Sequence, residues 1–460
     1  MKKLLLLFCL VSTINTKAQD FWTEYATAQP TTSTGVRSIS IVNQNVTWLN
    51  MACGTSGCQT IRRYAKTTNG GSVWTTGEID LGPDSNNLEI SNICGISATM
   101  AYAAVFPKSM TVTGGIWKTI DGGATWTKQP TAQFNSPNYS FTNHVYFWNA
   151  NEGVAMGDAA DGYFEIYTTS NGGELWTRVP SSPVLIPLAE NEYGINGNFI
   201  VNGDTIWALT LFGRLLKSVD KGLHWTVSQT PFTDGYFTIG INGGSTVDFS
   251  FSNSNNGLFQ GSDYTLYRTT DGGETFTEVT WTGVLRNFGI AAVPGMSNTY
   301  ISIGEDLDST SRGSSYSIDG GVTWFDINNN PDTNFVDGGQ IAMLNEDYGF
   351  ASGFSVTPTE GGIFRWGGGP MLRTAQLAVS TFAGDKSITV DPNPTLGVFN
   401  ISGENISQIK VYDVMGKQIM NVNYNAVSSA NINLDALTNG IYLVNVANDK
   451  GTSVIKVVKQ

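Results

Sequence analysis

The hydrophobic residues of this chain are gathered in short runs that glycine, asparagine and aspartate interrupt. The segments Gly115–Lys118 and Tyr264–Tyr267 are two such runs, and a polar turn follows each of them. Near the C-terminus hydrophobic and polar positions alternate, as at Ile409, Lys410 and Val411. Runs of this length between turn-forming residues predict β-strands joined by tight hairpins. The 52 glycines and the low charged fraction of 14% agree with this pattern, so we expect an all-β protein.

One polar turn recurs six times at a nearly constant spacing. The aromatic residues that end the copies lie 52, 50, 49, 51 and 48 positions apart. The copies are Thr67–Trp74, Thr119–Trp126, Thr169–Trp176, Ser218–Trp225, Thr269–Phe276 and Ser317–Trp324. The third residue of each copy accepts hydrogen bonds from the turn, and a following glycine supplies the positive φ angle of a hairpin. We therefore expect a structural role for these third residues, which are Asn69, Asp121, Asn171, Asp220, Asp271 and Asp319.

Each copy also contains an upstream pair of strands, joined by turns such as Asn149–Gly153 and Asn253–Gly257. Four strands in each repeat predict one blade of a β-propeller. Residues 341–366 repeat the upstream part of a blade but lack its fourth strand, whereas Phe21–Glu24 resembles Thr125–Lys128 of a complete blade. We expect the N-terminal strand to complete this last blade, which gives seven blades and closes the ring.

The six turns resemble Asp-box repeats, also called bacterial neuraminidase repeats, of the form Ser/Thr-x-Asp-x-Gly-x-Thr-Trp. With paired glycines and this spacing they are similar to the propellers of photosystem II assembly-factor-like proteins and of xyloglucan-cleaving glycoside hydrolases. The resemblance implies a seven-bladed β-propeller of four-stranded antiparallel blades over residues 19–370. It does not imply a function, because the motif belongs to the fold.

The last part of the chain differs from the repeats. Its blocks are Asp391–Gly397, Ile409–Lys417, Ile432–Val444 and Val454–Val458, and their alternation predicts a small β-sandwich. The order of the blocks resembles the type A C-terminal sorting domain of the type IX secretion system of the Bacteroidota, except that Asp391 stands where an aromatic residue is common. The resemblance implies an immunoglobulin-like β-sandwich over residues 387–460, after a linker at 371–386. It also implies contact with the type IX secretion machinery and a protein that is secreted or held at the outer cell surface.

The first 18 residues have the features of a secretory signal peptide. Lys2 and Lys3 precede the apolar run Leu4–Val11, which is shorter than the roughly 20 residues that span a bilayer. We expect cleavage before Gln19 and no membrane span. Removal of residues 1–18, which include three lysines, changes the net charge of −13 to −16. So acidic a chain is a poor partner for nucleic acid or anionic lipid.

The sequence offers little catalytic or metal-binding chemistry. It has two histidines, and neither lies in a zinc or Ser-His-Asp pattern, so we expect no metal and no cofactor. Cys53 and Cys58 can form a disulfide after export, and Cys94 lies in an apolar run as a buried thiol. A sialidase requires an Arg-Ile-Pro segment and an arginine triad, and the chain contains no Arg-Ile-Pro.

One group of acidic and aromatic residues is a candidate binding surface. In a four-stranded blade the loop between the second and third strands opens on the face opposite the Asp-boxes, and several of these loops carry carboxylates. The group consists of Asp158, Asp161, Tyr163, Asp263, Tyr264, Glu305, Asp306 and Asp308. Phe134, Tyr139, Tyr236 and Trp281 in blade connections add rings that stack on sugars. Three interpretations stay open: solvated loops, a glycan or cation site without catalysis, and a carboxylate pair that acts as general acid and base.

The preferred function is that of a non-catalytic binding protein for a glycan or a protein, because propellers present variable loops on a rigid support. A secreted glycoside hydrolase acting on polysaccharide is the alternative. A third possibility, an assembly or folding factor, predicts a co-purifying envelope partner that the sequence does not identify.

Overall fold

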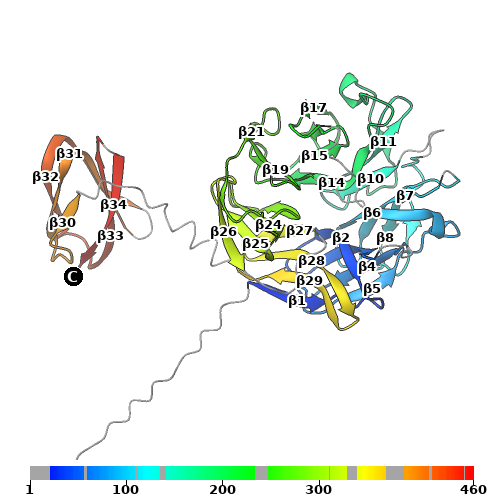
Figure 1. The fold of residues 1–460 in the computed structure, drawn as a ribbon, viewed down its shortest axis with the longest axis horizontal. Helices are drawn as coiled ribbons and strands as arrows, with labels where there is room; N and C mark the ends of the chain where they lie inside the picture. The colour runs from blue at the N-terminus through cyan, green and yellow to red at the C-terminus, as the bar shows by residue number, and fades with distance from the viewer. Residues whose placement is uncertain are drawn as a thin grey trace, which may run out of the picture. The chain divides into compact units, whose positions relative to one another are not determined.

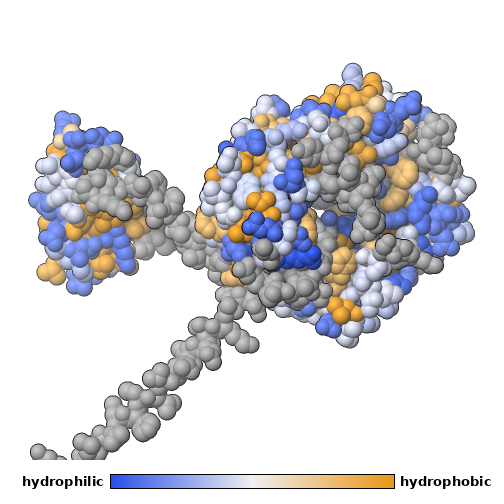
Figure 2. Space-filling model, viewed as in Figure 1, coloured by the Kyte–Doolittle hydropathy of each residue, from blue (hydrophilic) through white to orange (hydrophobic). Residues whose placement is uncertain are grey.

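The computed structural model describes residues 21–55, 60–109, 111–134, 141–233, 247–309, 311–328, 339–368, 388–413, 417–449 and 451–460. The chain divides into two compact units, Met1–Leu372 and Arg373–Gln460, drawn as a ribbon in Figure 1 and as a space-filling model in Figure 2. Several sequence predictions fall outside the described residues: the signal peptide, Cys58, Tyr139, Tyr236 and the linker at 371–386.

The first unit consists of antiparallel sheets arranged in sequence order around an axis (Figure 1). Blade I contains β2 (Thr34–Ile41), β3 (Thr47–Cys53), β4 (Arg63–Thr67) and β5 (Thr75–Glu78). Blade II contains β6 (Leu88–Gly95), β7 (Ala101–Pro107), β8 (Gly115–Thr119) and β9 (Thr127–Lys128). Blade III contains β10 (Thr142–Phe147), β11 (Gly153–Ala160), β12 (Tyr163–Thr169) and β13 (Thr177–Arg178). Blade IV contains β14 (Gly194–Asn202), β15 (Thr205–Thr210), β16 (Arg214–Ser218) and β17 (Thr226–Gln229).

The remaining blades complete the ring. Blade V contains β18 (Val247–Phe251), β19 (Gly257–Gly261), β20 (Leu266–Thr269) and β21 (Thr277–Glu278). Blade VI contains β23 (Gly289–Ala292), β24 (Tyr300–Glu305), β25 (Arg312–Ser317) and β26 (Thr323–Asn328), and β22 (Thr282–Gly283) adds a parallel strand at its outer edge. Blade VII contains β27 (Ile341–Asn345), β28 (Tyr348–Thr357), β29 (Glu360–Trp366) and β1 (Trp22–Ala26). Two 3-10 turns, η1 (Ser85–Asn87) and η2 (Pro183–Leu185), lie in blade connections.

The N-terminal strand closes the ring, as the sequence predicted. Strand β1 pairs with β29 in antiparallel register, and Trp22 lies opposite Trp366. The indole N–H of Trp22 also donates a hydrogen bond of 2.8 Å to Ser314 Oγ in blade VI. The seven innermost strands contact one another in the order β2, β6, β10, β14, β18, β23 and β27, and β27 contacts β2 again. The fold is therefore a seven-bladed propeller closed by its first strand.

The hydrophobic core is divided into layers between neighbouring blades. Six of the layers contain the aromatic residue that ends a box: Trp126, for example, packs with residues of blades I and II, and Trp176 with those of blades II and III. Trp74 occupies the equivalent layer between blades VII and I. The repeated aromatic residue thus attaches each sheet to its neighbour.

The box turns are held by a common set of hydrogen bonds. In the second box, Asp121 Oδ1 accepts bonds from the Thr125 N–H and the Thr119 hydroxyl, each at 2.9 Å. These bonds and that of the Thr125 hydroxyl lower the pKa of Asp121 to about 2. In the fourth box Lys221 replaces the first glycine, adopts a φ of 59°, and forms an ion pair with Glu152 of blade III.

The boxes also connect neighbouring blades. The carbonyl oxygen of Gly172 accepts hydrogen bonds of 2.8 Å from the Tyr102 hydroxyl and from Lys118 Nζ, both in the preceding blade. Trp207 donates to Gly272 O, and Arg365 donates to Gly70 O, in the same manner. In every box the N–H of the fourth residue also donates a hydrogen bond to the turn between the first two strands of its own blade. The Gly172 N–H, for example, donates to the carbonyl oxygen of Asn151. These turns share one side of the disc, here called the box face.

The second unit is a five-stranded sheet domain. Its strands are β30 (Thr389–Asp391), β31 (Val398–Asp413), β32 (Gln418–Asn433), β33 (Gly440–Asn448) and β34 (Gly451–Lys459). The order is β30-β31-β33-β34, and β32 pairs with β31. Its core includes Phe399, Ile409, Val411, Ile432 and Val444, which are the inward positions of the predicted alternation.

Candidate functional site

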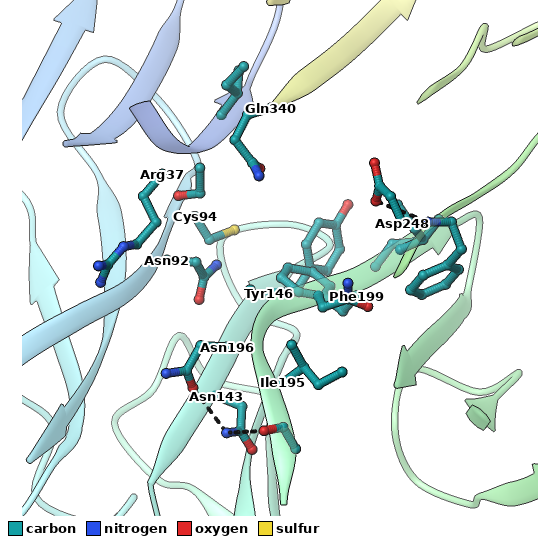
Figure 3. Close-up of a pocket in the computed structure, with 18 of the residues that line it drawn as sticks. Arg37, Asn92, Cys94, Asn143, Tyr146, Ile195, Asn196, Phe199, Asp248 and Gln340 are labelled. Atoms are coloured by element: carbon teal, nitrogen blue, oxygen red, sulfur yellow. Dashed lines mark hydrogen bonds between the residues drawn. The ribbon is translucent and has the colours of Figure 1, made fainter. Parts of the chain in front are cut away.

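A cavity of about 1460 Å³ is lined by residues from all seven innermost strands and therefore lies along the axis of the propeller. Figure 3 shows part of its wall. Residues from the side opposite the box face also line it. These are Phe106 and Phe141 near the strand ends, Asp161 in the turn between β11 and β12, and Tyr193 in a blade connection. Asp158 also lines the cavity, but it lies within β11 and not in the loop that the sequence predicted, because the strand extends to Ala160. The cavity therefore reaches the opposite face, where the loop sequences differ most from blade to blade.

Uncharged polar and aromatic side chains make up much of the cavity wall. Asn143, Asn196, Asn198 and Gln340 contribute amide groups, and Tyr146 lies beside Phe199 with ring centroids 6.1 Å apart (Figure 3). The amide oxygens of Asn143 and Asn198 are buried and accept no hydrogen bond within the described residues. Buried acceptors of this kind are usually satisfied by water or a ligand.

Two charged side chains in the cavity wall form an ion pair with each other. Arg37 Nη1 lies 2.5 Å from Glu89 Oε1, and the same nitrogen donates a hydrogen bond of 3.0 Å to Ile90 O. This ion pair connects the first strands of blades I and II. It leaves Arg37 engaged with protein groups, so the wall does not present an unbalanced cation.

Asp158 is the predicted candidate residue that lies deepest in the cavity wall. Its Oδ1 accepts hydrogen bonds from Asn143 Nδ2 at 3.1 Å and from the Gly194 N–H at 2.9 Å. Burial raises the pKa of the Asp158 carboxyl to about 7, although these two donors favour its charged form. The carboxyl therefore exchanges a proton near neutral pH, inside a cavity.

A second carboxyl, Asp248 on β18, has related properties. Its Oδ2 accepts a 2.8 Å hydrogen bond from the Ile290 N–H of the next blade. Burial raises the pKa of Asp248 to about 6, against the effect of its backbone donors. The side chain lines the cavity (Figure 3), and sequence reasoning missed it because Asp248 lies in an innermost strand and not in a loop.

Asp161, which lines the cavity, and Tyr163 contact the same arginine. Asp161 Oδ2 accepts a 3.0 Å hydrogen bond from Arg178, whose guanidinium carbon lies 4.1 Å from the Tyr163 ring centroid. Among the eight candidate binding residues, Asp158 and Asp161 line the cavity. The contacts of Arg178 connect the turn after β11, which carries Asp161, to β13.

The other candidate residues, apart from the exposed Asp308, bond to residues of their own or a neighbouring loop. Asp263 Oδ1 accepts a bond from the Thr265 N–H, and Glu305 forms an ion pair with Arg312 at 2.7 Å. The hydroxyl of Tyr264 donates to the carbonyl of Asp306, and Asp306 Oδ2 accepts from Ser311. Asp308 is exposed. These carboxylates stabilise loops on the opposite face and do not line the axial cavity.

Other aromatic residues named from the sequence occupy structural positions. Phe134 is fully buried against Tyr167, and the Trp281 indole donates to the carbonyl of Tyr264. Cys94 is a buried free thiol, as predicted, and Cys53 is disulfide-bonded. Because Cys58 lies outside the described residues, its pairing with Cys53 stays a prediction.

Two further findings concern the described residues as a whole. No set of three histidine, cysteine or acidic side chains in these ranges is arranged to hold a metal ion. The same ranges contain no helix with the length and hydropathy that a membrane crossing requires.

Residues 389–460 match the family model of the secretion system C-terminal sorting domain. The C-terminal unit is a secretion sorting domain. The type IX sorting domain predicted from the sequence is therefore confirmed, and it marks this protein for export through that secretion machinery to the outside of the cell. The family model covers residues of the second unit and does not extend into the propeller.

Solved structures resemble the propeller in fold. YCF48 from Cyanidioschyzon merolae is 15% identical, with 76% of this chain and 99% of that chain covered and a TM-score of 0.50. PorZ, a surface component of the type-IX secretion system of Porphyromonas gingivalis, is 13% identical over 92% of this chain and 59% of its own, with a TM-score of 0.45. The GH74 enzyme of Niastella koreensis is 14% identical over 90% and 72%, with a TM-score of 0.27. No curated protein sequence matches this chain. At these identities the similarity to YCF48 establishes the fold and no function.

Proposed function

We propose that this exported propeller is a non-catalytic binding protein that receives a glycan or protein ligand in its axial cavity, from the face opposite the boxes. The observation that carries the proposal is the cavity itself, about 1460 Å³ in volume and lined by every innermost strand. A volume of this size accommodates several sugar rings or a few side chains of a protein loop.

The chemistry of the wall supports an uncharged ligand group. Amides such as Asn196 and Gln340 both donate and accept hydrogen bonds, which suits hydroxyl and peptide groups. Tyr193 stands at the entrance with 43% of its surface exposed and offers a ring face for stacking. The ion pair of Arg37 with Glu89 is already satisfied, so an anionic ligand finds no free guanidinium there.

The test uses the full secreted chain and a panel of polysaccharides and extracellular proteins. We expect Tyr193→Ala and Gln340→Ala each to weaken binding of the captured ligand about tenfold, because each removes a contact from the cavity without removing a core residue. Asp308→Asn is the matched control, since Asp308 is exposed on the opposite face but outside the cavity. Unchanged affinity in both cavity variants, measured by calorimetry, contradicts the proposal.

One observation supports a second candidate, a glycoside hydrolase. Burial raises the pKa of the Asp158 carboxyl to about 7, so this group is protonated below neutral pH inside the cavity. A general acid needs such a proton to donate. If this is the function, sugar is released from a polysaccharide of the panel, and Asp158→Asn abolishes the release. The Asp161→Asn, Asp263→Asn and Asp306→Asn variants test the remaining carboxylates in the same assay. Binding with no release by the parent protein favours the first proposal.

A further inference from the structure

The innermost strand of blade IV contains a large irregularity. In β14, Gly194 pairs with Thr210 and Phe199 pairs with Ala208. Residues 195–198 therefore lie opposite the single residue Leu209 of β15. A β-bulge normally places two residues opposite one, and bulges are common next to functional sites. We call this four-residue segment, 195–198, which has three residues more than a regular strand, the strap.

The strap crosses the inner wall instead of following its own blade. Asn196 Oδ1 accepts a 3.1 Å hydrogen bond from Asn143 of blade III, and Asn198 Nδ2 donates a 3.1 Å bond to Val247 O of blade V. A β-carbon built on Gly197 lies 3.5 Å from Ser91 O in blade II. Accordingly β14 contacts β6, a strand two blades away. The strap thus connects blades II to V across one side of the channel.

Hydrogen bonds and packing hold the start of the strap in place. At its start, the Gly194 N–H donates to Asp158 Oδ1 at 2.9 Å and Gly194 O accepts from Asn143 Nδ2 at 3.3 Å. Ile195 is 7% exposed and packs with the core between blades IV and V. Gly197 has a φ of 71°, a conformation that other residues rarely adopt. Figure 3 shows Asn143 joined to Asn196, with Ile195 beside them.

The strap lies between two groups of cavity-lining residues. Phe106, Phe141 and Tyr193 line the cavity beyond its outer side, at strand ends and connections of the opposite face. Ile41 and Leu344 line it on the inner side, close to the turns that leave the innermost strands toward the box face. A ligand that enters from the opposite face on the side of blades II to V meets the strap first.

We propose that residues 195–198 form a strap that divides the axial cavity into an outer and an inner compartment and sets the size of molecule that reaches the inner one. The position of the strap follows from its contacts with blades III and V and needs no ligand. Its role in ligand selection rests on the proposed binding function.

Cys94 is a natural reporter of the inner compartment. It lies near the inner end of β6, lines the cavity, and is 5% exposed. It is a free cysteine, whereas Cys53 is disulfide-bonded. Burial raises the pKa of Cys94 to about 12, so its intrinsic reaction is slow and comparisons between variants are decisive.

The experiment measures the rate at which Cys94 reacts with methyl methanethiosulfonate, a small reagent, and with fluorescein maleimide, a bulky one. The full secreted chain is compared with a variant that lacks Asn196, Gly197 and Asn198, which leaves one residue opposite Leu209 and restores a regular strand. We expect the deletion to raise the rate about tenfold or more, with the larger gain for the bulky reagent. The double variant Asn196→Ala/Asn198→Ala keeps the chain length and removes the side-chain hydrogen bonds to Asn143 and Val247. We expect it to raise the reaction rate of Cys94 less than the deletion does.

Asn149→Ala is the matched control. Asn149 Oδ1 accepts hydrogen bonds from two N–H groups of a turn on the box face of blade III, so this variant loosens a turn of the neighbouring blade and leaves the contacts of the strap in place. Rates that stay unchanged in both strap variants overturn the proposal, and so does an equal rise in Asn149→Ala. Because neither reagent is a ligand, a positive result with no ligand found in the panel sustains the strap and contradicts the proposed function.

Discussion

Trp22 and Trp366 face each other at the junction where the propeller closes: their backbones are paired and their ring centroids lie 5.1 Å apart, edge to face. They are separated in sequence by nearly the whole propeller. The Trp22 side chain is 4% exposed and is bonded to Ser314. The first strand of the propeller is therefore part of the last blade, and its Trp22 side chain contacts blade VI.

We expect Trp22→Ala to destabilise the propeller by about 3–5 kcal/mol, because it leaves a large cavity at the closure and an unpaired Ser314 hydroxyl. The free energy of unfolding in urea measures the effect. Val73→Ala removes an exposed aliphatic side chain from a box and should change stability by less than about 0.5 kcal/mol. Equal effects of the two substitutions would show that β1 is not part of the fold.

A box residue tests whether these turns serve structure alone. Asn171 Oδ1 accepts hydrogen bonds from the Leu175 N–H and the Thr169 hydroxyl. We expect Asn171→Ala to lower stability by about 1–2 kcal/mol through loss of both bonds, with ligand affinity unchanged. Glu174→Ala in the same turn is the control and should leave both quantities unchanged. A loss of affinity in Asn171→Ala would move the binding site to the box face.

His144 predicts a loss of stability in acid. The imidazole is 1% exposed and stacks on Phe199, and burial lowers its pKa from 6.5 to about 3. Between pH 6.5 and about pH 3 the imidazole is therefore protonated in the unfolded chain and neutral in the folded chain. The free energy of unfolding falls as the pH falls through this range. From pH 7 to pH 4.5 we expect His144 to lower the free energy of unfolding by about 2 kcal/mol. His144→Phe keeps the ring and should reduce that loss in urea titrations; identical pH dependence in the variant would contradict the assignment.

Asp158 predicts the opposite dependence. Because its folded pKa is about 7 and its ordinary value is 3.8, the folded protein holds a proton that the unfolded chain has lost. The stability from this group is complete below pH 4 and is lost as the pH rises through 7. Asp158→Asn retains an acceptor for Asn143 and Gly194, so relative to the parent it should gain stability at pH 8 compared with pH 4. A difference between variant and parent that is independent of pH would show that Asp158 titrates normally.

The sorting domain makes a prediction about export. Removal of residues 389–460 deletes the segment that matches the sorting family and leaves the propeller strands intact. We expect the truncated chain to accumulate inside the cell envelope instead of in the medium or on the surface. Fractionation followed by immunoblotting measures the distribution, with Leu396→Ala, an exposed position in the domain, as a folded control. Normal export of the truncated chain would contradict the assignment.

The fold was predictable because its signals are local and repeated. Each box encodes a hairpin and a core aromatic, and the missing last strand of residues 341–366 is matched by the sequence around Trp22. The closure across the ring thus needed no long-range information beyond counting strands. The C-terminal unit was predictable for the same reason, since the alternation at Ile409 and Val411 identifies its buried face.

The site was much less predictable. Asn143 and Asn198 lie in segments that have the pattern of ordinary innermost strands, and single amide residues there do not reveal that they line a cavity. The strap depends on a register difference between β14 and β15, which appears only when both strands are placed. Gly197 was its one local signal. Conversely, the acidic loops looked like a shared rim, but Asp161 and Glu305 are held by arginines whose positions follow from strand pairing.

The cavity and the strap depend on the ring being closed by β1. Thr23 and Arg365 are register partners in β1 and β29, at a spacing suited to an engineered disulfide. The most direct measurement is mass spectrometry of the secreted Thr23→Cys/Arg365→Cys variant after air oxidation, with Thr23→Cys/Lys128→Cys as a mismatched control. The account predicts a cross-linked peptide joining residues 23 and 365 and none in the control. Free thiols at both positions in the folded protein would contradict it.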